Sequence, residues 1–155
     1  MAQALSLPDK ERSRVARTRV AHLATTRPDG GPHVVPITFA LVGEAVVTVV
    51  DHKPKRTIRL QRLVNVATNP RASVLVDYYD DDWNALWWVR IDGRADVIDE
   101  PALRTTLLAP LVAKYDAYRT TEPAGPLIRI ALEAWSSWSA SGDLPSHRLQ
   151  THGRP

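Results

Sequence analysis

Apolar and polar residues alternate along several short stretches of the chain, and a period of two is typical of β-strands with one buried face. The clearest stretch covers residues 85–97, where small or apolar residues such as Trp87, Val89 and Ile91 alternate with a mostly polar set. Shorter runs rich in β-branched residues cover residues 22–26, 33–41, 45–51, 71–79 and 127–139. The pattern therefore predicts six strands.

Tight turns join the first three of these strands. Asp29-Gly30 lies between two strand-like runs and is a strong hairpin signal. Val42-Gly43-Glu44 is a second turn, which leads into the third strand. Consecutive short strands with such turns predict an antiparallel meander.

Three helices are expected from the 3.6-residue period and from capping residues. Ser6 and Pro8 predict the start of a basic helix that ends near Arg17. A second helix is predicted over residues 55–66, with a buried stripe formed by Leu60, Leu63, Val64 and Ala67. A third begins at Asp99-Glu100-Pro101, with its leucines, residues 103, 107, 108 and 111, on the inner side.

These elements predict a mostly β (α+β) fold: a six-stranded antiparallel barrel with flanking helices. The alternative is an open α+β sheet. We expect one domain over residues 1–141 and a mobile tail over residues 142–155, which show no pattern. The composition, with 44% hydrophobic and 24% charged residues, is that of a globular protein.

The chain has no cysteine, which excludes disulfides and thiolate metal sites. It shows neither a secretory signal nor an apolar run long enough to span a membrane, so we expect a cytoplasmic protein with no membrane partner. A net charge of +3 suits a phosphate-bearing ligand but is too small to indicate nucleic acid, for which no motif is present either.

The basic turn, residues 52–57, is the most informative candidate site. Lys53, Lys55 and Arg56 crowd the predicted start of the second helix. Free backbone N–H groups and the helix dipole favour an anion there and disfavour cations, so several cations at that point suggest a phosphate guest. A solvated basic face is the alternative, and the residues alone weigh the two evenly.

Aromatic residues form the second candidate. Trp87 falls on the buried face of its strand, whereas Trp88 falls on the opposite face beside Arg90, where it predicts a subunit interface or a wall for a stacked ring. The acidic loop Asp80-Asp81-Asp82 is expected to be a solvated loop rather than a metal site. The five histidines show no metal spacing, and no catalytic motif is present, so a cofactor would carry any chemistry.

The ordered set of motifs resembles the pyridoxamine 5′-phosphate oxidase-like split β-barrel family over residues 15–140. The opening strands carry the resemblance in residues 21–26, 29–30 and 35–39. Residues 53–57 and 69–77 resemble the centre of the actinobacterial branch that uses the deazaflavin coenzyme F420. Residues 81–83, 87–90 and 93–95 continue the match, as do Trp135 and Trp138 in the last strand.

This resemblance implies a homodimer with two cofactor sites at the subunit interface. The cofactor phosphate would lie against Lys53, Lys55, Arg56 and Thr57, and the ring system near Pro36, Thr38, Val50 and Asp51. The second subunit would close the site with Trp83, Trp88 and Arg90. No side chain is assigned as catalytic or metal-binding.

The implied function is an F420-dependent oxidoreductase that transfers a hydride between the deazaflavin and a small organic substrate. FMN is the alternative cofactor, since the same phosphate turn would serve it. A split barrel that binds flavin, deazaflavin or haem without turnover is the alternative function.

Overall fold

The computed structural model describes residues 5–50 and 60–144. The helices are α1 (Asp9–Arg17), α2 (Gln61–Thr68), η1 (Trp83–Ala85, a 3₁₀ turn), α3 (Pro101–Lys114) and α4 (Asp116–Thr120). The strands are β1 (Ala21–Thr26), β2 (Pro32–Ile37), β3 (Ala40–Val42), β4 (Ala45–Val49), β5 (Arg71–Tyr78), β6 (Trp87–Ile98) and β7 (Leu127–Ser139). None of the described helices is long and apolar enough to cross a membrane.

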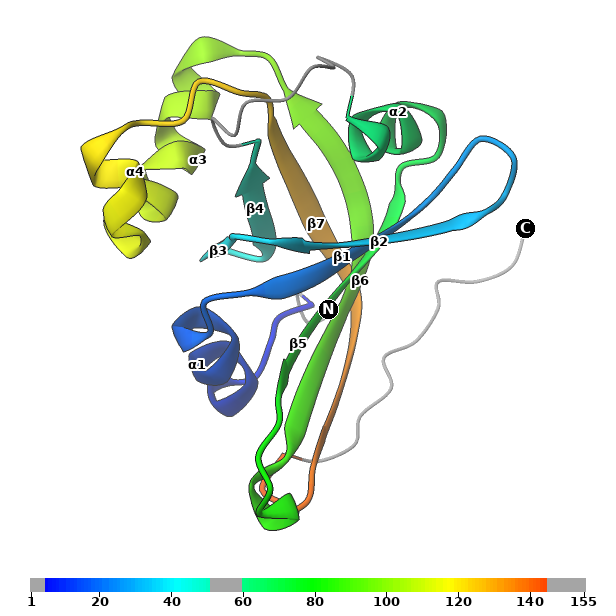
Figure 1. Cartoon of the computed structure of the whole chain (residues 1–155), viewed down its shortest axis with the longest axis vertical. Helices are drawn as coiled ribbons and strands as arrows, with labels where there is room; N and C mark the ends of the chain where they lie inside the picture. Colours follow the sequence, from blue (N-terminus) through cyan, green and yellow to red (C-terminus); the bar gives the residue numbers. More distant parts are fainter. Residues whose placement is uncertain (1–4, 51–59, 145–155) are drawn as a thin grey trace.

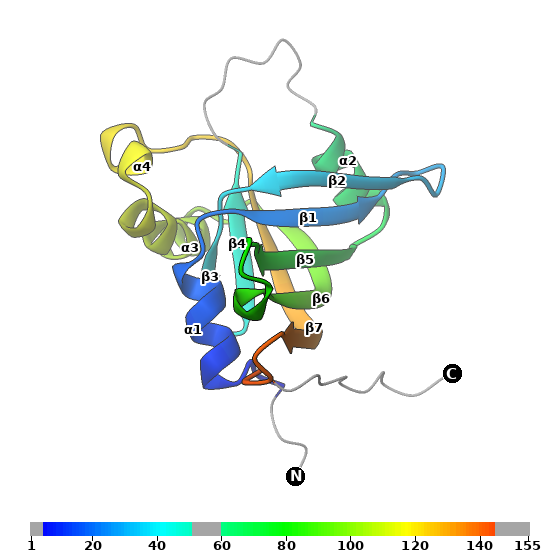
Figure 2. The same cartoon turned by 60° about the horizontal axis from the view of Figure 1, so that its bottom comes forward.

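One antiparallel sheet organises the chain, with the strand order β2-β1-β5-β6-β7-β4-β3. Figure 2 shows β2, β1, β5, β6 and β7 side by side in this order. The sheet curls, and its two edge strands, β2 and β3, follow one another in the chain with two residues between them (Figure 1). The prediction of an antiparallel split barrel is confirmed, and the open-sheet alternative is wrong.

The sheet has seven strands rather than the predicted six, because the run 33–41 is interrupted at Thr38 and Phe39. The chain leaves the ladder with β1 after Ile37 and enters the ladder with β4 at Ala40. The phenol of Tyr115 accepts a hydrogen bond from the freed N–H of Phe39 at 3.0 Å and lies 3.1 Å from its carbonyl oxygen. This buried hydroxyl satisfies backbone groups that a continuous strand would have paired.

The long strands β6 and β7 carry the bulk of the core. Residues 89, 91, 93 and 95 of β6 are buried and alternate with more exposed neighbours, as the sequence predicts. In β7 the buried positions change from even to odd numbers, because Glu133 is an extra residue opposite the step from Asp92 to Gly93. A bulge of this kind bends the strand and lets both halves face the same core.

The core has two parts. One fills the curled sheet beneath α1 and α2, with Phe39, Leu23 and Ile91 among its fully buried members. The other lies between β4 and the helices α3 and α4, where Leu107, Leu108 and Leu111 are buried as predicted.

Two helix starts differ from the predicted ones. Helix α1 begins at Asp9 after Pro8, with no side-chain cap, so Ser6 does not cap it. Helix α2 begins at Gln61 because Leu60 has an extended backbone. In α2 the buried residues are Asn65 and Val66, whereas Ala67 is exposed. The predicted stripe through Ala67 is therefore wrong at that position.

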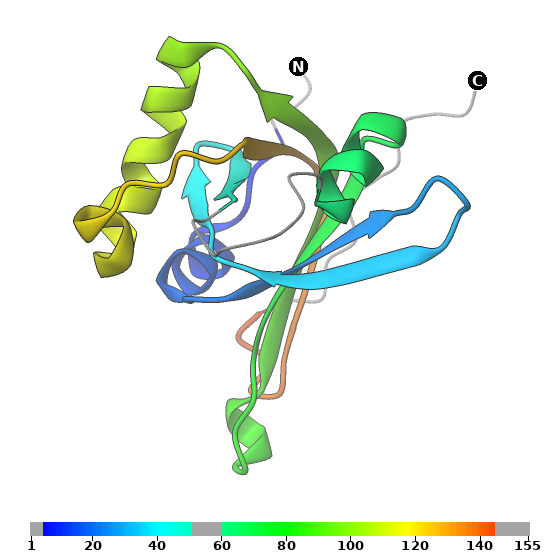
Figure 3. The same cartoon turned by 45° about the horizontal axis from the view of Figure 1, so that its top comes forward.

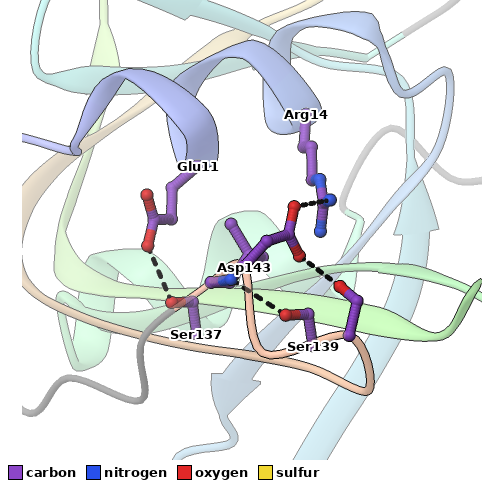
Figure 4. A network of polar contacts seen from close by, with 7 residues as sticks. Glu11, Arg14, Ser137, Ser139 and Asp143 are labelled. Atoms are coloured by element: carbon purple, nitrogen blue, oxygen red, sulfur yellow. Dashed lines mark hydrogen bonds and ion pairs between the residues drawn. The ribbon is translucent and has the colours of Figure 1, made fainter. Parts of the chain in front are cut away.

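A polar clamp ties α1 to the end of β7 and the turn that follows it (Figure 4). Glu11, which is 1% exposed, accepts a hydrogen bond from Ser137 at 2.9 Å. Arg14 donates to the carboxylate of Asp143 at 2.6 Å, and Leu144 is buried in the core. The predicted tail begins at residue 142, and these first residues of it pack on the domain; residues 145–155 lie outside the described part.

Candidate functional site

The outer face of the sheet carries a groove of about 560 Å³. Residues paired across neighbouring strands form rows on this face. Pro36 lies opposite His22, His22 opposite Leu75, and Leu75 opposite Arg90, which makes one row across four strands. A second row places Asp77 opposite Trp88 and Trp88 opposite Trp138. The groove is lined by parts of these rows and by neighbours in the same strands: His22, Ala24, Val34, Ser73, Leu75, Asp77, Tyr78, Tyr79, Leu86, Trp87, Trp88, Arg90 and Trp138.

Large apolar side chains of this sheet-face groove are exposed in the single chain. Val34 is 61% exposed and Trp138 is 39% exposed. One face of an antiparallel sheet packs on the core and the other is expected to be polar. A contiguous apolar outer face of this kind marks a binding surface rather than ordinary solvent-facing sheet.

Polar side chains of the groove form two pairs, and Asp92 is the one member of these pairs that is not part of the groove lining. Nδ1 of His22 lies 3.9 Å from Oδ1 of Asp77, and both side chains are half-exposed. Arg90 donates to Asp92 at 3.0 Å, and Ser73 donates to the other oxygen of that carboxylate at 2.5 Å. Aromatic walls with a few polar groups are the usual composition of a site for an organic ligand, and the volume lies within the range of such sites.

The structure brings together three of the predicted site residues. Trp88 and Arg90 line the groove, and Pro36 stands at the edge of the same row as Arg90. Trp88 and Trp138 add aromatic surface to the same face.

Trp83 lies apart from this group. It belongs to η1, at the tip of the arm formed by β5 and β6, and it is 69% exposed (Figure 3). The acidic residues beside it serve the loop itself: Asp80 accepts hydrogen bonds from Tyr78 and from the backbone of Asp82. These bonds lower the pKa of Asp80, with the Asp82 backbone as the larger cause.

Thr38 and Val50 lie at other points of the barrel. The hydroxyl of Thr38 is 2.6 Å from that of Tyr118, at the corner where β2 passes into β3. Val50 follows β4, and its N–H donates to Pro126 at 3.0 Å. Neither residue is part of the groove lining.

The basic turn is the part of the predicted site that the structure does not describe, since Asp51, Lys53, Lys55, Arg56 and Thr57 lie outside the described residues. The basic residues precede Gln61, where α2 begins, by several positions. Helix α2 therefore begins after these residues rather than at Lys55, as the sequence predicted.

Sequence reasoning missed His22 and Asp77 as members of one site, and it missed Tyr118 as the partner of Thr38. Alternation in residues 22–26 does place His22 on the solvent face. His22 lies close to Asp77 and Arg90 because of the register of three strands, and local sequence does not show that register.

Comparison with known proteins identifies the family to which the chain belongs. A family model described as pyridoxamine 5′-phosphate oxidase matches residues 7–139. Among curated protein sequences, none matches this chain significantly.

Solved structures with the same fold include three with sequence identities of 21%. A conserved hypothetical protein from Mycobacterium tuberculosis superposes with a TM-score of 0.72 over 99% of this chain and 96% of its own. A heme binding protein from Mycobacterium smegmatis gives 0.72 over 93% of this chain, which spans 60% of that protein. An FAD-binding protein from Mesorhizobium loti gives 0.59 over 81% of this chain and 87% of its own. Likeness at this identity establishes the fold and leaves the ligand open.

Proposed function

The chain belongs to the pyridoxamine 5′-phosphate oxidase family, and on that premise we propose that it is a cytoplasmic F420-dependent reductase of a small organic substrate. The sheet-face groove is the observation that carries the proposal. It combines aromatic walls, a volume of about 560 Å³ and two pairs of polar side chains on an otherwise apolar surface. FMN is the alternative cofactor.

The chain's own residues would bind and orient the cofactor. Lys53, Lys55, Arg56 and Thr57 would hold its phosphate, and Pro36, Thr38, Val50 and Asp51 would lie along its ring. When bound, the reduced deazaflavin supplies a hydride. The protein would contribute to catalysis by excluding water from the ring and by aligning the ring with the substrate.

A second copy of the chain completes this proposal. The exposed apolar face would be buried by the same face of a second subunit in a symmetric dimer. The His22–Asp77 and Arg90–Asp92 pairs would then lie in this interface. The arm formed by β5 and β6 projects from the barrel and ends in Trp83 (Figure 3). In the dimer Trp83, Trp88 and Arg90 would close the partner's cofactor site.

Cofactor titration tests the assignment. Purified protein is titrated with F420 and, separately, with FMN while ring fluorescence is followed. We expect tighter binding of F420, and the triple variant Lys53→Gln, Lys55→Gln, Arg56→Gln should weaken it by tenfold or more, since three charge-assisted contacts to phosphate are removed. The control, Lys10→Gln with Arg71→Gln, removes two cations elsewhere and should leave affinity unchanged.

Two results would overturn the assignment. Binding of FMN alone removes the deazaflavin from the proposal, and unchanged affinity in the triple variant moves the phosphate away from the basic turn.

A binding module without turnover is the second candidate function. The structural likeness to a heme binding protein favours it. Haemin titration, followed by the Soret band, tests for haem. Bound reduced cofactor that stays reduced against a broad panel of acceptors would favour this second function over the reductase.

A further inference from the structure

We infer that His22, which lies beside Asp77, is the proton donor of the reaction in the sheet-face groove. This inference rests on the proposed reductase function and adds a catalytic residue to it. Its basis is the position of one imidazole among the groups that were expected to surround the cofactor.

The reaction requires a proton from some source. Reduction of a carbon–carbon or carbon–oxygen double bond adds one hydride and one proton, so the substrate gains two electrons and two hydrogens. The hydride comes from the reduced deazaflavin, which is oxidised. The proton comes from the imidazolium of His22, and the neutral imidazole regains a proton from water. General acids within hydrogen-bond reach typically contribute a factor of about 10²–10⁴ to such steps.

His22 occupies the centre of the relevant face. Its register partners are Pro36 on β2 and Leu75 on β5, and Arg90 on β6 is the next member of the row. Thus three residues predicted to surround the cofactor, namely Pro36, Trp88 and Arg90, stand on the same face as the imidazole. Among the described residues that line the groove, His22 is the only histidine.

Asp77 is the carboxylate beside the ring. Its Oδ1 lies 3.9 Å from Nδ1 of His22, so the pair is an ion pair whenever the ring is protonated. This places Asp77 on the Nδ1 side and leaves Nε2 to deliver the proton to a guest. A carboxylate beside an imidazole is a common arrangement in acid–base sites.

The other charged groups near His22 leave this pairing in place. From β6, Arg90 faces the same row, but its guanidinium is bound to Asp92 at 3.0 Å, and Asp92 also accepts from Ser73. From β2, the facing residues are Pro36 and Val34, which carry no charge. His22 is 42% exposed, so the imidazole is accessible to a guest in the groove.

The variant His22→Gln tests the inference, because glutamine has a similar length and no transferable proton near neutral pH. We expect F420 affinity within twofold of wild type and turnover about 100-fold lower. His33→Gln is the matched control: it removes another strand histidine, one that is not part of the groove lining, and should keep wild-type turnover.

A second measurement uses no turnover. In NMR spectra of the full-length protein, oxidised F420 should shift the ring Cε1–H signal of His22 and leave that of His33 unchanged. If F420 binds but neither the His22 signal nor the turnover of His22→Gln changes, His22 is not the donor, and the reductase function still stands. If neither F420 nor FMN binds, both the function and the donor assignment fail.

Discussion

Lys114, the last residue of α3, has its ammonium group buried against aromatic rings. Nζ lies 3.9 Å from the centroid of the Phe39 ring and 5.5 Å from that of Tyr115. Among the described residues it has no hydrogen-bond partner. Burial lowers the pKa of Lys114 from 10.5 to about 8, and the nearby Arg19 guanidinium adds to the shift. The face of an aromatic ring recovers only part of the lost hydration.

Because of this environment, we expect the free energy of unfolding to change with pH in the alkaline range. Between pH 8 and 10.5 the unfolded chain binds more protons at Lys114 than the folded chain, so the free energy of unfolding rises with pH in this range. Lys114→Met should therefore be more stable than wild type at pH 7, and the difference should shrink towards pH 10.5. Each pKa unit is worth about 1.4 kcal/mol at most, and residual hydration reduces the measured gain. Urea unfolding at several pH values provides the measurement, and a pH-independent difference would contradict the prediction.

Gly93 is required by a close approach of two strands. A Cβ at this position would lie 2.1 Å from the carbonyl oxygen of Ala131, a backbone atom that cannot move aside easily. Gly93→Ala should lower the free energy of unfolding by about 2–3 kcal/mol, as overpacking in a bulged ladder does. Gly43→Ala is the comparison: it meets no atom within 4 Å but has a φ of +57°, so it should cost about 1 kcal/mol. Equal small losses in thermal or urea unfolding would show that the strands separate easily.

At the scale of elements, the polar clamp decides how α1 is held. Arg14 of α1 donates a hydrogen bond to the carboxylate of Asp143, and the N–H of Leu144 donates to the hydroxyl of Ser139 at 2.9 Å. Hydrogen bonds from Ser141 and then Ser139 lower the pKa of Asp143, and Arg14 lowers it further. The clamp thus joins the first helix to the end of the last strand through groups that require an ionised carboxylate.

Asp143→Asn should therefore destabilise the protein near neutral pH and not in acid. A lowered carboxyl pKa contributes stability above the unfolded value near 4, and this contribution is lost as the pH falls through the folded value. The gap between wild type and variant should be present at pH 6 and close by about pH 2–3. Urea unfolding at both pH values measures it. The control Asp116→Asn removes an exposed partner of Arg119 on α4 and should change the free energy of unfolding little at either pH. A stability difference between wild type and Asp143→Asn that persists in acid would contradict the proposed role of the clamp.

Most of the elements could be predicted because their signals are local. The alternation in residues 85–97, the turn at Asp29-Gly30 and the leucines of α3 each specify an element within a few residues. The split of 33–41 into β2 and β3 could not be predicted, because the break depends on Tyr115, more than 70 residues later in the chain. The start of α2 was misplaced because the leucine at position 60 fits a helical stripe but serves as an extended N-cap.

The candidate site was predictable in part for the same reason. Trp88 and Arg90 could be placed on the outer face from alternation alone, and the structure has both in the groove. The groove itself requires β2, β1, β5, β6 and β7 in register, which is a property of the whole sheet. His22 and Asp77 become neighbours only through that register, so no local pattern indicates their pairing.

At the scale of the whole molecule, the exposed apolar groove predicts that the chain associates with itself. Val34 lies in the groove and is 61% exposed, so Val34→Arg should fold normally while placing an unpaired charge in the proposed interface. We expect wild type to sediment as a dimer and this variant as a monomer, with dimer dissociation shifted by 100-fold or more in concentration. Val20→Arg is the matched control, because Val20 is 48% exposed but lies outside the groove lining, and it should remain dimeric.

Analytical ultracentrifugation distinguishes these outcomes. A dimeric Val34→Arg variant would place the interface elsewhere, and a monomeric wild type would leave the groove as a ligand site within a single chain. Loss of F420 binding in the monomeric variant would further tie the cofactor site to the interface, since the Trp83 of the partner subunit could no longer reach it.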